Sequence, residues 1–310
     1  ARERWSLPTL DQFFQDARYA LRGLRKSPGF TATAIVTLAL GIGANAAMFG
    51  VVDRLMFRPY AYLEDPETVH RVYLRTMGRE SENVFSIFEY TRYLDIKQLT
   101  SSFSEYAAFS RSTMALGTGD ASRERQVAMV SGTFWNFFDA RPVLGRFFTP
   151  AEDATPRGAD VAVLAHAYWQ SEFGGRDVTG QRLQVGHIPT TIIGVAPEGF
   201  VGVNEANPPA VYIPITLFGG SKPDEEDRNT FFSHYHWGWM SMMVRRQPGV
   251  TVAQASADVR QAYRKSWDRE REQSPDLTPP EIAKPTAEVA AMKLAAGPDP
   301  RLKARTALWL

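Results

Sequence analysis

A long apolar run near the N-terminus is the clearest pattern in the chain. From residue 30 to residue 52 no side chain is charged, and only Asn45 is strongly polar. At ~1.5 Å of rise per residue such a helix is roughly 35 Å long, enough to cross a hydrocarbon layer of about 30 Å. Basic residues precede the run and acidic residues follow it (Arg18, Arg22, Arg25 and Lys26; Glu64, Asp65 and Glu67). This asymmetry predicts a helix across a bacterial inner membrane, with a cytoplasmic N-terminus and a periplasmic bulk.

Other interpretations of the run stay open. Ala44-Asn45-Ala46 has the small residues of a signal-peptide cleavage site. A buried helix of a soluble protein would also be apolar, although such helices are usually shorter and carry a polar stripe. The glycines from Gly41 onwards loosely match a dinucleotide-binding fingerprint. Such a site needs a preceding strand and an acidic residue about twenty positions later within a βαβ unit, whereas these glycines lie inside the uncharged run.

Small residues inside the run favour contact with another membrane helix. Gly41, Gly43 and Ala47 have little or no side chain, and small side chains let two helices approach closely in lipid. We therefore expect these residues to pack against an integral membrane partner, while the lipid bilayer surrounds the rest of the helix.

The segment before the run has a helical period. Apolar residues recur on one side and polar residues on the other (Leu10, Phe13, Phe14, Ala17, Leu21 and Leu24 against Asp11, Gln15, Asp16, Arg18 and Arg22). This pattern predicts an amphipathic helix on the cytoplasmic membrane surface. Ser27-Pro28-Gly29 then predicts a break where the chain turns into the bilayer.

After Arg58-Pro59 the pattern changes to short strands and helices. It predicts strands at 69–77, 236–245 and 286–295, and helices opened by capping boxes at Ser86–Glu89 and Thr251–Gln254. The first helix is expected to end near Leu99. The second should bury the stripe Val252, Ala255, Val259, Ala262, Tyr263 and Trp267.

The middle of the chain consists of short strands separated by Gly and Pro turns, expected at 125–131, 161–165, 182–186, 190–195 and 211–215. We interpret it as a β-rich subdomain inserted into an α+β one, which makes the fold class α+β. The polar segment 219–230 is expected to be a mobile loop that joins them.

Composition excludes several classes of function. The net charge is only +1, whereas a nucleic-acid partner needs a concentrated basic face. The chain has no cysteine, so disulfides, thiolate metal sites and a thiol nucleophile are excluded. It also has no Gly-x-x-x-x-Gly-Lys-Ser/Thr loop to cradle ATP phosphates. We expect no cofactor.

Few residues are arranged for catalysis. His234 and His236 stand at strand spacing and are weak metal-ligand candidates, with oxygen ligands nearby (Asp224, Glu225, Glu226 and Asp227). Such a pair beside Trp237 and Trp239 is more often ordinary aromatic packing or an interface. The neighbours Glu152 and Asp153 diverge in direction, so they could not flank one substrate bond. The sequence predicts no catalytic residue and no enzyme.

Aromatic residues offer a candidate contact surface. Phe134 and Trp135, within an aromatic group that runs to Phe138, and Trp237 and Trp239 are the candidates for a periplasmic surface that binds a partner. The alternative for the group at 134–138 is that it belongs to the hydrophobic core.

Several segments resemble the MacB/FtsX-type ABC permeases, especially those without an ATPase of their own. They are LALGIGANAAMFGVVDRLMFRPYAYLEDPE (38–67), GTFWNFFDARPVLGRFFTPAED (132–153), VAVLAHAYWQSEFGG (161–175), TTIIGVAPEGFVG (190–202) and VRRQPGVTVAQASADV (244–259). The resemblance implies a first transmembrane helix and a MacB-like periplasmic core domain, made of a porter-like subdomain with the β-rich one inserted. It also implies coupling to ATP hydrolysis by a cytoplasmic ABC ATPase and three further transmembrane helices.

On this basis we expect six regions. They are a cytoplasmic amphipathic segment (1–29), the transmembrane helix (30–57), the first porter-like part (58–105), the inserted β-rich subdomain (106–225), the second porter-like part (226–297) and a return towards the membrane (298–310).

Three functions remain in view. We expect a single-pass structural or interaction subunit of a larger membrane complex, whose host could be a transport, respiratory or photosynthetic assembly. The first alternative is an N-terminal fragment of a permease that couples ATP hydrolysis to efflux or lipoprotein handling. The second is a periplasmic binding module for a hydrophobic ligand.

Overall fold

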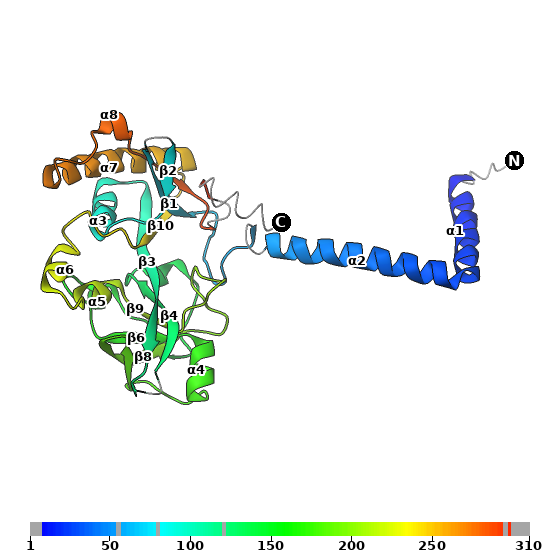
Figure 1. The fold of residues 1–310 in the computed structure, drawn as a ribbon, viewed down its shortest axis with the longest axis horizontal. Coiled ribbons are helices and arrows are strands. Elements are labelled where there is room, and N and C mark those ends of the chain that lie inside the picture. Colours follow the sequence, from blue (N-terminus) through cyan, green and yellow to red (C-terminus); the bar gives the residue numbers. More distant parts are fainter. Residues whose placement is uncertain (1–7, 54–56, 79–80, 120–121, 294–296, 299–310) are drawn as a thin grey trace. The chain divides into compact units, whose positions relative to one another are not determined.

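The computed structural model describes residues 8–53, 57–78, 81–119, 122–293 and 297–298. The chain divides into two compact units, an N-terminal unit that ends at Leu55 and a folded domain that begins at Met56 (Figure 1). Each unit is described by itself. The predicted return segment 298–310 lies almost wholly outside the described residues.

The N-terminal unit consists of two helices, α1 (Pro8–Lys26) and α2 (Pro28–Val52). Ser27 separates them with a non-helical ψ of 70°, and Pro28 occupies the first turn of α2, where its missing N–H costs no hydrogen bond. Thr31 Oγ1 donates to the carbonyls of Leu24 (2.7 Å) and Ser27 (3.0 Å). The predicted break at Ser27-Pro28 is confirmed, and hydrogen bonds fix it.

Helix α2 is the described helix that is long and apolar enough to cross a membrane. Its mean hydropathy is 2.0 over the most apolar window, and none of that window is buried. Phe30, Leu40 and Phe49 each expose about 70% of their surface. The alternative of a buried helix in a soluble protein is therefore wrong, because nothing in the described chain covers this helix.

The described part of the domain forms one eleven-stranded sheet. Its strands are β1 (Val69–Met77), β2 (Glu82–Phe85), β3 (Phe103–Leu116), β4 (Arg123–Val130), β5 (Leu144–Gly145), β6 (Val161–Leu164), β7 (Arg182–Val185), β8 (Ile188–Val195), β9 (Val211–Pro214), β10 (Ser241–Arg246) and β11 (Thr286–Ala290). The spatial order is β11-β1-β10-β3-β4-β9-β6-β8-β5, with β2 on β1 and β7 on β3 and β8.

Short helices connect the strands and one long helix packs on the sheet. They are α3 (Tyr90–Leu99), α4 (His166–Phe173), α5 (Ile215–Gly220), α6 (Glu225–Thr230), α7 (Val252–Gln273) and α8 (Pro280–Ala283), with 3-10 turns η3 (Phe134–Phe137) and η4 (Pro150–Asp153). Helices α7 and α8 lie at one end of the domain and α4 at the other (Figure 1).

Strand β3 joins the two halves of the domain. Its first part pairs with β10, from Phe103 to Phe109, and its second part pairs with β4, from Phe109 to Leu116. The strand runs through residues 105 and 106, where the sequence placed a subdomain boundary. The two predicted subdomains thus share one continuous strand, and their limits stay a prediction.

Side chains alternate between two cores on opposite faces of the sheet, as the pleat requires. In β4, Val127 and Met129 belong to one core, while Ala128 and Val130 belong to the other. Helices α3 and α7 contribute to the first core, and η3 contributes aromatic rings to the second. Both faces are covered, which explains the strongly apolar strands of this region.

Helix α7 begins as predicted. Thr251 and Gln254 form the reciprocal capping box, and the residues Ala255, Val259, Ala262, Tyr263 and Trp267 are buried. Val252 is 43% exposed, so its place in the buried stripe is wrong. The predicted strands at 69–77, 161–165, 182–186, 190–195 and 211–215 are confirmed within a residue or two.

Other predictions were wrong. Ser86–Glu89 is not a capping box, because α3 begins at Tyr90 and the Phe88 N–H instead donates to the Met240 carbonyl (2.8 Å). The strand expected from His236 begins only at Ser241. The expected loop 219–230 contains the end of α5 and the whole of α6, which Asp224 caps by accepting from the backbone N–H of Glu226 and Asp227.

Candidate functional site

The small residues of α2 fall on different sides of the helix. Gly43 and Ala47 are four apart and share a face, whereas Gly41 precedes Gly43 by two positions and points about 200° away. The prediction that Gly41 and Gly43 pack together against one partner therefore does not fit helix geometry. Gly43 and Ala47 can do so, and Gly41 lies on another side.

One face of α2 consists almost entirely of small side chains. Alternating steps of four and three residues place Ala32, Val36, Ala39, Gly43, Ala46 and Gly50 in a single row. A Cβ added at Gly41, Gly43 or Gly50 would meet nothing within 4 Å in the described chain. Bulky residues flank the row on one side, about 60–120° from it around the helix (Ile35, Leu38, Ile42 and Phe49). Nothing inside the described chain thus requires glycine at these positions.

Phe134 and Trp135 lie in the core. Their side chains are 1% and 7% exposed, and Trp135 stacks on Phe147 at a centroid distance of 4.0 Å. Phe200 and Tyr212 complete the same aromatic group. Their proposed role as a contact surface is wrong, since they offer almost no exposed area, and the core alternative holds for this group.

Trp237 and Trp239 are half-buried in a second aromatic group. The ring centroid of Phe231 lies 5.0 Å from that of Trp239 and 6.3 Å from that of Trp237. Lys222 Nζ lies over the rings of Phe218 and Trp237, at 4.7 and 5.2 Å. These rings form a cage around a lysine of the same chain, so most of the aromatic surface in this segment is already occupied.

His234 and His236 are exposed and their ring centroids are 5.5 Å apart. They do not lie on a strand, and Tyr235 between them is buried with its hydroxyl donating to Asp95. Among the described residues no group of three potential ligands could hold a metal. Tyr235 anchors this segment. The two rings are therefore not neighbours through the predicted strand spacing.

Glu152 and Asp153 point in different directions, as the sequence indicated. Both terminal nitrogens of the Arg146 guanidinium donate to Glu152 at 2.7 Å, and this pairing lowers the pKa of Glu152 to about 2. Asp153 accepts from Thr216 Oγ1 (2.7 Å) and from the N–H of Gly132 (3.0 Å), while burial raises its pKa. Both carboxylates hold loops in place.

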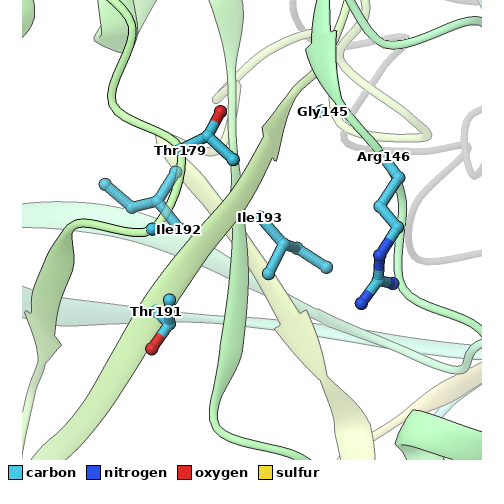
Figure 2. A pocket seen from close by; sticks show the side chains of 7 residues that line it. Gly145, Arg146, Thr179, Thr191, Ile192 and Ile193 are labelled. Atoms are coloured by element: carbon cyan, nitrogen blue, oxygen red, sulfur yellow. The ribbon is translucent and has the colours of Figure 1, made fainter.

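A shallow pocket of about 400 Å³ opens where β7 and β5 leave a gap along one edge of β8 (Figure 2). The backbone N–H groups of Gly180 and Arg146 bridge the gap to the carbonyls of Ile192 and Ile193. Since this backbone is paired and Arg146 is neutralised by Glu152, the pocket is a poor candidate for a substrate site.

A buried charge network, which sequence reasoning missed, connects α3, α7 and the segment around Tyr235. Asp95 accepts hydrogen bonds from Tyr235, Ser266 and Arg269. Arg92, 3% exposed, pairs with Glu270 and donates to Ser266 Oγ at 3.0 Å. Arg92 and Asp95 are three apart on α3, and this pair of charges on one helix face is the signal that could have indicated the network.

A second cluster ties the segment after β11 to the segment that follows α2 in sequence. Lys293 Nζ lies 2.7 Å from Glu205 Oε2 and 4.0 Å from the ring centre of Tyr60. Arg71, buried in β1, donates to the Met292 carbonyl at 3.3 Å. We call Tyr60, Arg71, Glu205 and Lys293 the Lys293 cluster. Its members are far apart in sequence, so no local pattern reveals it.

The chain has known relatives. The family model described as the MacB-like periplasmic core domain matches residues 31–262. The chain belongs to this family. The match includes α2 as well as most of the domain, and this MacB-like domain is the periplasmic part of ABC permeases.

A curated relative is longer than this chain. The macrolide export ATP-binding/permease protein MacB of Azoarcus sp. (strain BH72) is 26% identical over 215 residues, which are 67% of this chain and 32% of that protein. The chain thus spans about a third of the length of this curated relative.

A solved structure shows the same fold. A domain of a candidate permease from Porphyromonas gingivalis superposes with a TM-score of 0.55 at 15% identity, covering 76% of this chain and 92% of that one. The periplasmic region of MacB from Actinobacillus actinomycetemcomitans gives a TM-score of 0.48 at 13% identity, with coverage of 69% and 95%.

Proposed function

We propose that this chain is a non-enzymatic, membrane-anchored subunit whose MacB-like domain serves as a structural and interaction module of a larger membrane complex. In this proposal α2 spans the inner membrane, the N-terminus is cytoplasmic and the folded domain is periplasmic. The host is a transport, respiratory or photosynthetic assembly.

The exposed small-residue face of α2 carries the proposal. Helices associate in lipid through van der Waals contact between closely approaching backbones, and a row of Ala and Gly permits that approach. Gly43 has open space around it in the described chain. A neighbouring helix from another protein would fill that space and bury the row.

The domain supports a structural role because its elements are tied to one another. Strand β3 runs through both halves, and the Arg92–Asp95 network and the Lys293 cluster join distant segments by buried polar contacts. Such contacts fix one arrangement, because breaking any of them leaves a buried charge unpaired. A fixed domain suits a scaffold.

A matched pair of variants tests the proposal. The full chain would be purified from native membranes in mild detergent, alongside Gly43→Ile and Gly41→Ile, which add the same side chain to different faces. We expect the wild type and Gly41→Ile to retain stoichiometric integral membrane partners and Gly43→Ile to lose them. A wild type that elutes as a single copy without partners overturns the proposal, as does equal behaviour of the two variants.

A second candidate is the mechanical module of a permease. The family match across α2 and the domain favours it, and the curated relative is named as an ATP-binding/permease protein. The same purification distinguishes this candidate. A cytoplasmic ABC ATPase among the partners, with cross-links between chain and partner that change on ATP addition, supports the permease. A bound lipid or drug without protein partners supports the hydrophobic-ligand carrier instead.

A further inference from the structure

Helix α1 carries a row of arginines that nothing in the described chain engages. Arg18, Arg22 and Arg25 follow one another at spacings of four and three residues, so they share one face of the helix, and all three are exposed. Among the side chains that the structure describes, no carboxylate pairs with any of them.

An apolar face of α1 beside the arginine row is uncovered. Leu21 and Leu24 expose 53% and 39% of their surface and lie about 60° and 120° from Arg18 around the helix. A helix with arginines beside a leucine face matches the boundary between lipid headgroups and acyl chains, because long arginine side chains reach the headgroups while the leucines enter the acyl region.

The junction with α2 holds α1 at that boundary. Only Ser27 lies between the helices, and the Thr31 hydroxyl and N–H both return to the end of α1 through Leu24 and Ser27. When α2 enters the membrane at Pro28, the last turn of α1, with Arg25 and Lys26, has to lie at the headgroup level. This placement holds for either orientation of α2.

We propose that α1 binds anionic phospholipid headgroups in the leaflet on the N-terminal side of α2, through Arg18, Arg22 and Arg25. A guanidinium group presents a planar fork of donors that matches the oxygens of a phosphate. The three arginines then neutralise lipid phosphates while Leu21 and Leu24 enter the acyl region. This inference goes beyond the proposed subunit role and does not depend on a protein partner.

The absence of cysteine makes a direct test simple, because single-cysteine variants need no background changes. Ala20→Cys places a label on the apolar side of α1, and Gln15→Cys places one on the polar side. The full chain would be reconstituted in vesicles of phosphatidylcholine alone and of phosphatidylcholine with about one third phosphatidylglycerol. Accessibility of each label to a neutral aqueous quencher is the measurement.

In anionic vesicles we expect the label at residue 20 to be protected and the label at residue 15 to remain accessible. Replacing Arg18, Arg22 and Arg25 by Gln should remove most of the preference for anionic vesicles. Each basic residue near an anionic surface raises the equilibrium constant for binding of α1 to that surface about five-fold, which gives roughly 100-fold for three. The control replaces exposed Arg264 and Lys265 of α7 by Gln, and vesicle flotation verifies that every variant remains inserted.

Three results would overturn the inference. The labels could be equally accessible in both vesicle types, or residue 20 could be equally protected with and without phosphatidylglycerol. Protection that requires an added protein would assign the face to a protein partner. None of these results bears on the pair of Gly43 and Gly41 variants, so the two proposals fail separately.

Discussion

Lys293 and Glu205 form an ion pair of 2.7 Å whose side chains are only 11% and 16% exposed. The lysine also lies over the ring of Tyr60, in the middle of the segment that links α2 to β1. This contact joins the chain shortly after the apolar helix with the chain shortly after the last strand. The folded domain thus closes on itself at this point.

Removing one partner of the pair should destabilise the domain. Glu205→Gln removes the carboxylate that lies 2.7 Å from a largely buried ammonium, so we expect a loss of about 3 kcal/mol in the free energy of unfolding. The double variant Glu205→Gln/Lys293→Met should lose clearly less, because it removes both charges of the pair. Denaturant unfolding of the full chain in detergent measures both. Equal losses in the single and double variants would show that the pair is not coupled.

The exposed pair Arg125–Glu172 is the matched control. Its atoms are 3.4 Å apart and both side chains are more than 40% exposed. Solvent screens such a pair, so Glu172→Gln should change the free energy of unfolding by at most about 0.5 kcal/mol.

Asp95 should be the most sensitive position on α3. Asp95→Asn removes the charge that Tyr235, Ser266 and Arg269 donate to and leaves buried Arg92 with less compensation. We expect a loss of about 3 kcal/mol and faster hydrogen exchange in α3, α7 and residues 233–236. Asp268→Asn, an exposed position on α7, is the control and should leave exchange unchanged. Hydrogen exchange in Asp95→Asn that is as slow as in the wild type would contradict a stabilising role for the network.

Buried His70 should make stability depend on pH. Burial, and then the neighbouring Arg246, lower the pKa of His70 to about 4, against an unperturbed value near 6.5. The unfolded chain therefore binds a proton between these values that the folded chain does not. Stability is complete above pH ~6.5 and falls by on the order of 3 kcal/mol as the pH drops to about 4.

Glutamine at position 70 tests this pH dependence. His70→Gln can still accept the hydrogen bond that Arg246 Nε donates to His70 Nε2 at 2.7 Å, but it does not titrate. The difference in melting temperature between wild type and variant should be smaller near pH 4 than at pH 7. Parallel curves over this range would exclude His70 as the titrating group.

Gly194 should tolerate no side chain. A Cβ there would lie 2.3 Å from the carbonyl oxygen of Arg146, in the close approach of β5 to β8. Because backbone has to move, Gly194→Ala should cost about 2 kcal/mol. Gly238→Ala is the control, since its nearest neighbour would be 3.6 Å away. Thermal unfolding compares the two, and equal melting temperatures would refute the steric argument.

Local patterns predicted much of the fold. Val69 to Met77 mixes apolar and polar residues in a strand-like pattern, and Val161 to Leu164 is a short apolar run. The capping box at Thr251 marks the beginning of α7. In each case the local preference agrees with the tertiary structure, which is the condition under which a pattern is informative. The uncharged run predicted α2 for the same reason.

Strand β3 was missed because its residues do not favour a strand by themselves. Ala107, Ala108 and several serines have low strand preference, so pairing with β10 and β4 forms the strand. The aromatic group at 134–138 was ambiguous for a related reason. Composition cannot distinguish rings that fill a core from rings that bind a partner. Distant contacts such as Lys293–Glu205 leave no local signal at all.

The central claim is that α2 spans the membrane, with α1 on the cytoplasmic side and the folded domain on the periplasmic side. Cysteine labelling tests this claim most directly. Ser274→Cys lies on the exposed end of α7, Gln15→Cys on α1 and Ile42→Cys in the middle of α2. With a membrane-impermeant maleimide on intact spheroplasts, we expect only Ser274→Cys to react, with Gln15→Cys reacting after lysis and Ile42→Cys in neither condition. Reaction of Ser274→Cys only after lysis, or release of the chain from membranes without detergent, would contradict the account.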